Sequence, residues 1–392
     1  MRILFYRYNS ICEPDMIEAM KSLGNEVVEI REEMENKNFT LQECVALVGK
    51  TLLESQYDMV FSVNFYPALS EVCQICKIRY VSWIVDCPVL ELYSYAIRNE
   101  WNRIFIFDHA LYLDFVKENP DCIFYLPLAV NVGNSDRARS LIGESERNNY
   151  AGDITFIGSL YTEKSPFRKI EGLPKYLKGY FNGIIEAQLK VYGYSFIEEL
   201  LNDDMVEAFK KQVPQFYQFP EKAIHDDKAV TAHSYLGMEV SARERLNLLS
   251  ALSEESSLQI YTYSDTSLIP KARNRGGAES KLQMPQIFAL SKINLNITAR
   301  PIRTGLPQRI WDIIGAGGFL LTNYQSELEN YFEIGKEIDV FGSEQELLEK
   351  TAYYLSHEKE RVEMSKRAYE KVKTYHTYSQ RMQQLLQMAW ER

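Results

Sequence analysis

Short apolar runs alternate with amphipathic stretches through the first third of the chain. Met16, Met20 and Leu23 recur at helical spacing before Gly24, and residues 41–53 form a second pattern of this kind. Apolar runs of strand length surround these helices at residues 1–6, 26–30, 57–63, 79–85, 102–107 and 122–126. Strands that alternate with helices in this way predict an α/β domain with a parallel, doubly wound sheet.

The same alternation returns further along the chain. A strand is predicted at residues 153–158, where it runs into a glycine turn. The later elements are predicted as helices at 243–252, 284–290, 306–315, 344–355 and 358–388 and as strands at 258–263, 293–297 and 318–322. This pattern predicts a second doubly wound domain after the first.

Two segments interrupt the alternation. Residues 135–152 are mostly polar, which indicates a linker between a first domain at 1–134 and a second domain at 153–374. Residues 165–240 carry long helical patterns and many aromatic residues, which predicts a helical insertion in the second domain. Two consecutive doubly wound domains predict a ligand cleft between them, at the carboxyl ends of the strands.

Composition and charge exclude several classes of protein. Hydrophobic residues make up 46% of the 392 residues and charged residues 25%, which excludes wholesale disorder. The formal net charge of −10 and the lack of a basic tract argue against a nucleic-acid partner. No apolar run approaches the ~20 residues of a membrane span, and the first residues lack the pattern of a signal peptide. We therefore expect a cytoplasmic protein without a membrane span.

The distribution of cysteine and the number of tyrosines bear on metal binding, disulfides and ligand binding. All six cysteines lie in the first third, and Cys73 and Cys76 form a C-x-x-C without a second pair at metal-ligand spacing. We expect reduced thiols, no disulfide framework and no metal site. The 26 tyrosines are mostly expected to pack in cores, although some can line a groove for a sugar or a base.

Residues 296–322 hold the most informative cluster of polar and glycine residues. Thr304 and Gly305 stand before the helix predicted to begin near Leu306, where free backbone N–H groups favour phosphate oxygens. Arg303 and Arg309 add cations that can bind phosphate in a bidentate manner. Asp312 follows Arg309 by one turn and can accept hydrogen bonds from a ribose. The alternative is a capped helix with a surface Arg–Asp pair.

Motifs along the chain give this cluster a family context. The pattern N-I-T…R-T-G-L-P-Q-R-I-W-D-I-I-G-A-G-G-F-L-L-T over residues 296–322 resembles the C-terminal half of the spore maturation protein CgeB-like glycosyltransferases. In that family an Arg-x-aromatic-acidic step precedes a G-G-F-x-L-T strand. Further segments resemble the family in the same order, at residues 57–64, 80–88, 125–131, 156–159 and 375–381. The resemblance covers most of the chain except residues 165–240.

The resemblance implies a GT-B fold, in which two Rossmann-like domains face a cleft and the second binds most of a nucleotide-diphosphate sugar. UDP is the nucleotide that the family favours. The helix at residues 375–392 is expected to return to the first domain. Such enzymes commonly need no metal cofactor, because helix N-termini and cations neutralise the leaving diphosphate. Retaining relatives often carry a Glu-x7-Glu pair, but Thr304 stands where the first Glu would pair with Asp312, which favours inversion.

The residues can then be given expected roles. The diphosphate is expected at Arg303, Thr304, Gly305, Leu306 and Arg309, and the ribose at Asp312. Weaker candidates for donor contacts are Gly158, Ser159, Tyr263 and Lys281, whose alternative roles are a tight turn, core packing or a solvated side chain. The candidate bases are Asp86 and His109, which follow strands of the first domain. Their alternative roles are helix capping for Asp86 and packing for His109.

Other functions remain compatible with these residues. A nucleotide-sugar epimerase or hydrolase needs the same donor site without an acceptor, and a non-catalytic binding module needs donor binding alone. A dehydrogenase is disfavoured, because Arg7-Tyr-Asn-Ser follows the first strand in place of G-x-G-x-x-G. The acceptor stays open between protein or peptide, glycan and metabolite, and so does the oligomeric state.

Overall fold

The computed structural model describes residues 1–36, 38–213, 216–219 and 223–391 and forms two compact units. The first unit comprises Met1–Ala129, Gln218–His225 and His376–Arg392, and the second comprises Val130–Tyr217 and Asp226–Tyr375. Each unit is built on its own six-stranded sheet with all described strand pairs parallel. The prediction of an α/β protein with two doubly wound sheets is therefore confirmed.

The first sheet has the strand order β2-β1-β3-β4-β5-β6. Its strands are β1 (Arg2–Tyr6), β2 (Glu26–Ile30), β3 (Met59–Val63), β4 (Arg79–Ile84), β5 (Asn102–Ile106) and β6 (Ile123–Tyr125). Its helices are α1 (Glu13–Ser22), α2 (Glu32–Glu35), α3 (Leu41–Glu54), α4 (Pro67–Cys76), α5 (His109–Phe115) and α17 (Tyr378–Trp390). The order in which strands are added across the sheet reverses between β1 and β3, which pair in parallel with Leu4 opposite Val60.

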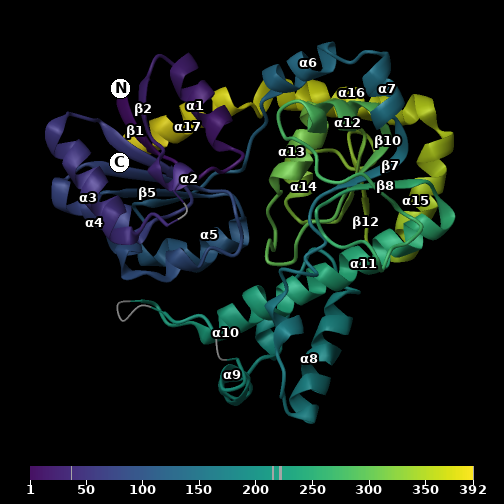
Figure 1. Ribbon diagram of the computed structural model, residues 1–392, viewed down its shortest axis with the longest axis horizontal. Coiled ribbons are helices and arrows are strands. Elements are labelled where there is room, and N and C mark those ends of the chain that lie inside the picture. The colour runs from purple at the N-terminus through teal and green to yellow at the C-terminus, as the bar shows by residue number, and fades with distance from the viewer. Residues whose placement is uncertain (37, 214–215, 220–222, 392) are drawn as a thin grey trace. The chain divides into compact units, whose positions relative to one another are not determined.

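Helices cover both faces of the first sheet, which explains why the central strands β3 and β5 are buried along their whole length. Alternate residues such as Leu4 pack with α3 and α4 in one core. On the other face α1 contacts α17 (Figure 1). The Trp83 and Tyr378 ring centroids lie 6.0 Å apart. The last helix of the chain is thus part of the first unit.

The second sheet has the strand order β12-β11-β10-β7-β8-β9. Its strands are β7 (Gly152–Ile157), β8 (Leu258–Tyr261), β9 (Arg273–Asn274), β10 (Ser291–Asn296), β11 (Leu320–Asn323) and β12 (Asp339–Phe341). Its helices include α11 (Met238–Glu255), α12 (Gln283–Leu290), α13 (Gln308–Gly315), α14 (Leu328–Tyr331), α15 (Glu344–Ser356) and α16 (Glu358–Tyr375). The order in which strands are added across the sheet reverses between β7 and β10, which pair in parallel with Ile154 opposite Ile293.

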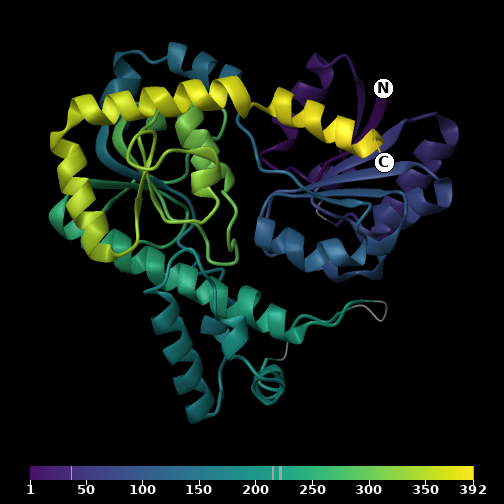
Figure 2. The same cartoon turned by 180° about the vertical axis from the view of Figure 1, so that it is seen from behind.

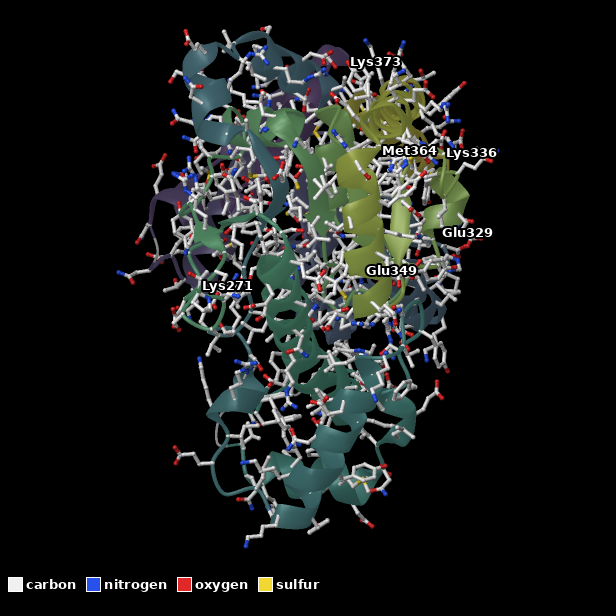
Figure 3. The ribbon with its side chains drawn as sticks, turned by 90° about the vertical axis from the view of Figure 1, so that its right-hand side faces the viewer. Lys271, Glu329, Lys336, Glu349, Met364 and Lys373 are labelled. Carbon is white, nitrogen blue, oxygen red and sulfur yellow. The ribbon has the colours of Figure 1, made fainter. Side chains whose placement is uncertain are left out.

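The helices of the second unit also form two layers. Residues of α11 and α15 pack with the sheet in one core, while α12 and α13 contact β10 from the other side (Figure 2). Figure 3 looks onto α15, which carries Glu349, and onto α16, which carries Met364 and Lys373. Met364 is only 1% exposed, so α16 contributes to the same core.

The segment predicted as a linker, residues 135–152, differs from that expectation. It forms α6 (Val132–Ser140), α7 (Glu144–Tyr150) and the first residue of β7. Both helices contact α12, and the Gln286 side chain donates to the Ala138 carbonyl at 3.0 Å. The polar pattern is misleading here because small residues such as Ser135 and Ala138 form the buried side of α6.

The predicted insertion at residues 165–240 is helical in the structure. It contains α8 (Lys175–Gln188), α9 (Asp203–Lys210), α10 (Asp227–Ala229) and a π-helical segment (Val230–Gly237) that leads into α11. Its aromatic residues pack on one another: the Phe209 ring lies 5.3 Å from that of Phe181 and 5.2 Å from that of Tyr235. Much of the aromatic content of this segment is therefore core.

Part of the insertion belongs to the first unit. The Ile224 backbone N–H donates to the Tyr93 carbonyl at 2.7 Å, and the Phe219 ring lies 5.5 Å from that of Tyr93.

All six cysteines are free thiols. Within the described residues, no helix combines the length and the apolar character needed to cross a membrane.

The packing of α17 can be tested by truncating a core residue. Leu385 is fully buried, so Leu385→Ala is expected to lower the free energy of unfolding by about 2–5 kcal/mol. Three of the four tryptophans lie in the first unit, so urea unfolding followed by tryptophan fluorescence reports mainly on this unit. The matched control is Gln383→Ala at an exposed position of α17. Equal effects of the two substitutions would contradict the packing of α17 on the first sheet.

Candidate functional site

The strand order of the second sheet predicts a ligand site at the carboxyl ends of β7 and β10. Open α/β sheets bind ligands at the carboxyl ends of two neighbouring strands between which the strand order reverses, because the loops that follow these two strands diverge. Gly158 follows β7, and its N–H donates to the Tyr261 carbonyl at 3.1 Å. A Cβ on Gly158 would lie 3.3 Å from the Phe156 ring, so the loop passes close to the sheet here.

A buried arginine joins the two strand ends. Arg245 lies on α11, is 7% exposed, and donates from Nη1 to the Ser159 carbonyl and from Nη2 to the Ile297 carbonyl at 2.5 Å. Its Nε is buried and has no hydrogen-bond partner. Burial lowers the pKa of Arg245, and Tyr161 and Glu244 counteract part of this effect. The two carbonyl bonds fix the loops after β7 and β10 relative to each other.

Tyr161 marks the same point with an unusual backbone conformation. Its φ is +62°, which bulky residues rarely adopt and which signals local strain. The Arg245 guanidinium lies 4.3 Å from the centroid of the Tyr161 ring, a cation–π contact. The surrounding structure must therefore hold Tyr161 in place against its own preference.

Arg309 is the second cation of this edge. Its side chain is 22% exposed and contacts Asp312 at 3.4 Å, and its guanidinium lies 5.5 Å from the Phe288 ring centroid. Burial lowers the pKa of Arg309; Asp312 opposes this shift, and the charge of Arg245 adds to it. An anion between the two guanidinium groups would relieve their repulsion, so this edge is a candidate anion site.

The helix that carries Arg309 begins later than predicted. α13 starts at Gln308 with Pro307 as its N-cap, and not near Leu306. The residue before a proline is disfavoured in the helical conformation, which excludes Leu306 from the helix. The first backbone N–H groups of α13 are therefore those of Gln308 and Arg309.

The remaining predicted diphosphate residues lie in the loop before α13. Leu306 is 2% exposed, so its side chain belongs to the core, while Arg303 and Thr304 are partly exposed. Glu198 of the insertion lies near Arg303: His233 lowers the pKa of Glu198 most, and the Arg303 charge contributes. Gly305 is buried at the end of this loop.

A buried polar network anchors that loop to the sheet. The Asn296 amide donates to the hydroxyls of Thr298 and Thr322, both at 2.9 Å. The Thr298 N–H donates to the Asn323 side chain at 2.8 Å. These bonds join the carboxyl ends of β10 and β11, so the loop starts from a fixed position.

Asp312 faces the first turn of its own helix. It accepts a hydrogen bond from the Gln308 amide at 2.8 Å in addition to its contact with Arg309. Its side chain is 25% exposed. Both the expected ribose contact and the alternative of an intrahelical Arg–Asp pair are compatible with this position.

The weaker donor candidates are spread over a wider area. Ser159 accepts the Tyr161 N–H at 3.0 Å and donates to Glu163 at 2.9 Å, so it shapes the loop after β7. Tyr263 lies beyond the end of β8 and is 94% exposed, which excludes core packing. The Lys281 backbone is held by Glu279 and Asn134 before α12.

The first sheet carries a second polar cluster at its carboxyl edge. Asn64 follows β3 with φ +58°, and its Nδ2 donates to Asp86 Oδ2 at 2.7 Å and to the Tyr8 hydroxyl at 2.8 Å. Its Oδ1 accepts the N–H of Val85 at 3.0 Å. Asn64 therefore joins the loops after β1, β3 and β4 and holds the Asp86 carboxylate, which is exposed.

His109 occupies the next position along this edge. It is the first residue of α5, whose N-cap Asp108 accepts the Leu111 N–H at 2.9 Å. The His109 ring is exposed and lies 5.2 Å from the Tyr125 ring. Asp86 and His109 thus follow neighbouring strands, β4 and β5.

Sequence reasoning missed Arg245, Tyr161 and Asn64. Arg245 stands in the run Arg-Glu-Arg on a predicted helix, which is typical of a solvated surface. Tyr161 has no signal in the sequence, because its role depends on φ. Asn64 ends the strand motif at residues 57–64, and asparagine tolerates left-handed backbone conformations. An asparagine directly after a strand was therefore the one sequence signal for a residue that turns the chain at the sheet edge.

The described part of the chain contains no group of three or more His, Cys, Asp or Glu side chains that could hold a metal ion. At the carboxyl edge of the second sheet, Arg245, Arg309 and the N-terminus of α13 contribute positive charge.

Comparisons with known proteins agree with this architecture. The model of a glycosyl transferase-like family matches residues 243–387. No curated protein sequence matches the chain.

Solved structures match the chain over nearly its whole length at low sequence identity. A glycosyltransferase from Rickettsia africae is 10% identical with a TM-score of 0.58, covering 100% of this chain and 98% of its own. The Anabaena protein HepE, solved with UDP and glucose, is 12% identical with a TM-score of 0.56, covering 99% and 98%. A UDP-forming trehalose-phosphate synthase from Burkholderia xenovorans is 10% identical with a TM-score of 0.52, covering 99% and 98%. The chain has the GT-B glycosyltransferase fold.

The role of Arg245 can be tested through stability. Arg245→Ala removes the guanidinium donors of the buried Ile297 carbonyl and the partly buried Ser159 carbonyl, so the free energy of unfolding is expected to fall by about 2–3 kcal/mol. The control is Arg147→Ala on the exposed surface of α7, with an expected change within about 0.5 kcal/mol. Chemical denaturation followed by circular dichroism measures both. A loss no larger than in the control would contradict the bridging role.

Proposed function

We propose that this protein is a glycosyltransferase that moves a sugar from a nucleotide-diphosphate sugar, with UDP as the expected nucleotide, to an acceptor. The observation that carries the proposal is the pair of partly or fully buried arginines at the reversal point of the second sheet. Burial and the Arg245 charge lower the pKa of Arg309, and an anion bound beside the two guanidinium groups would offset the effect of the Arg245 charge. The UDP bound to the similar HepE structure supports a nucleoside diphosphate as that anion.

The diphosphate is proposed to bind at Arg309 and the N–H groups at the start of α13, with Arg303, Thr304 and Gly305 in the preceding loop. Backbone N–H groups and cations that are already in place stabilise the charge that develops on the leaving diphosphate. This supplies the positive charge of the reaction from the chain itself, so we propose that transfer needs no metal ion. Asp312, one turn after Arg309, is proposed to accept hydrogen bonds from the ribose.

The acceptor side is proposed to lie on the first unit. In the transfer step an acceptor hydroxyl attacks the anomeric carbon, the bond from that carbon to the diphosphate oxygen breaks, and the hydroxyl proton passes to a base. Asp86 is the preferred base, because Asn64 fixes its carboxylate at 2.7 Å and leaves it exposed. His109 on the neighbouring strand is the second candidate.

The donor site is tested by two variants, each measured with UDP and with inorganic pyrophosphate. Arg309→Ala is expected to raise the dissociation constant of UDP by about 30- to 150-fold, which corresponds to the loss of about 2–3 kcal/mol for a charge-assisted contact. The same variant should raise the dissociation constant of inorganic pyrophosphate by a similar factor. Asp312→Ala should weaken UDP but leave pyrophosphate unchanged, because only UDP has a ribose. Isothermal titration calorimetry measures each dissociation constant, and unchanged UDP affinity in Arg309→Ala would contradict the diphosphate assignment.

The base is tested by separating turnover from donor binding. Asp86→Asn keeps the shape and the contact with Asn64 but cannot take up a proton, so kcat is expected to fall by about 100-fold or more with unchanged UDP affinity. Transfer is followed by UDP release from UDP-glucose with and without a saccharide acceptor. If His109→Gln loses turnover and Asp86→Asn does not, the base is His109. Donor hydrolysis that no acceptor increases would favour the epimerase or hydrolase alternative.

A further inference from the structure

The carboxyl edge of the first sheet combines tyrosine rings with carboxylates. The Tyr8 and Tyr66 rings lie 6.0 Å apart, and the Tyr66 ring lies 5.3 Å from that of Tyr6. The Tyr66 hydroxyl lies 3.5 Å from Glu33 and the Tyr6 hydroxyl 2.5 Å from the same carboxylate. Aromatic faces stack on the C–H faces of sugars, while carboxylates and amides bind hydroxyl groups.

The tyrosines remain neutral hydrogen-bond donors. Burial raises the pKa of Tyr8, and the neighbouring Asp86 charge raises it further. Burial and the Glu33 charge have the same effect on the pKa of Tyr66. Both phenols therefore keep their protons at neutral pH, and the Tyr8 hydroxyl donates to Asp86 at 3.4 Å and the Tyr66 hydroxyl to Glu33 at 3.5 Å.

The arginine of this edge is already engaged by carboxylates. Arg7 follows β1 and pairs with Glu13 at 3.0 Å and with Glu29 at 2.7 Å, and its side chain is only 11% exposed. Glu13 is fully buried and also accepts the Tyr8 N–H at 2.8 Å, which fixes the loop that carries Tyr8. Arg7 thus shapes the loop and offers no free charge to a ligand.

Among the residues that the structure describes, the loops that follow the strands carry more acidic than basic groups. Arg31, which follows β2, pairs with Glu29 at 2.7 Å. The carboxylates in or next to these loops belong to Glu13, Glu29, Glu32, Glu33, Asp86 and Asp108, whereas the guanidinium groups there belong to Arg7 and Arg31. Like charges at short range repel, so this edge disfavours a phosphorylated ligand.

We propose that this edge is an acceptor subsite for an uncharged or amine-bearing saccharide and that it discriminates against sugar phosphates. The inference rests on the proposed glycosyltransferase function and names the class of its acceptor. Tyr8 and Tyr66 supply aromatic surface and donate to Asp86 and Glu33. Asp86 and Glu33 accept hydrogen bonds from hydroxyl or ammonium groups of the ligand, and Asn64 positions Asp86.

The test uses the full chain with UDP-glucose as donor and with matched acceptors. Glucose, glucosamine and maltose are compared with glucose 6-phosphate, by binding in saturation-transfer NMR and by KM for UDP release. The unphosphorylated sugars are expected to bind at least tenfold more tightly than glucose 6-phosphate. Equal or tighter binding of the phosphate would overturn the proposal, and so would the absence of binding by all four sugars.

Two pairs of variants connect the result to the named residues. Asn64→Gly keeps the left-handed backbone and removes the amide, so KM for the unphosphorylated sugar should rise about tenfold; Asn9→Gly, at another left-handed asparagine, is the control. Glu33→Gln should lower the ratio of KM for glucose 6-phosphate to KM for the unphosphorylated sugar about threefold or more. Glu35→Gln, at an exposed position of α2, should leave this ratio unchanged. Unchanged values in Asn64→Gly and Glu33→Gln would overturn the assignment.

Binding of the acceptors is measured both with and without UDP. A protein that binds no UDP but still binds the unphosphorylated sugars would contradict the proposed function while the saccharide subsite stands. A protein that binds UDP but none of the sugars would contradict the subsite alone.

Discussion

Parallel strand pairing is the constraint on which the rest of this structure depends. When all strands of a sheet run in one direction, the loops that follow them gather along a single edge, and the helices are confined to the two faces. The site residues of each unit therefore come from segments far apart in sequence. In the second unit Ser159, Arg245, Ile297 and Arg309 meet in this way, with one guanidinium joining two strand ends.

The two edges are built with opposite electrostatics. The edge of the second sheet holds two guanidinium groups whose charges disfavour each other, and the edge of the first sheet engages its arginines with carboxylates. Since the chain as a whole carries a net charge of −10, an anionic ligand is attracted by local groups and not by a general basic field. Each domain can thus select its own ligand class through a few side chains.

The fold was predictable because the central strands, such as β3 and β5, are buried along their whole length and therefore contain mostly apolar residues. The strands at residues 26–30 and 79–85 match β2 and β4 closely, and the helix at residues 41–53 matches α3. The polar segment at residues 135–152 was not recognised as helical, since α6 packs through small residues. The start of α13 was misplaced because the effect of Pro307 on Leu306 outweighs the helical pattern.

The site was only partly predictable, for a physical reason. Asp86 and Arg309 follow strand ends or begin helices, and such positions can be read along the chain. Arg245 was hidden because charge on a helix usually faces solvent, and Tyr161 because its role depends on a backbone angle. The assigned roles of Asp312, Tyr263 and Lys281 remain predictions.

The return of α17 to the first sheet has a consequence for the order in which the protein folds during synthesis. Domains generally fold as units as they leave the ribosome, N-terminal ones first. Here the face of the first sheet that bears Trp83 receives its contact with Tyr378 only after the whole second unit has been made. The first domain to be translated is therefore the last to be completed, and its apolar face stays uncovered by α17 for most of translation.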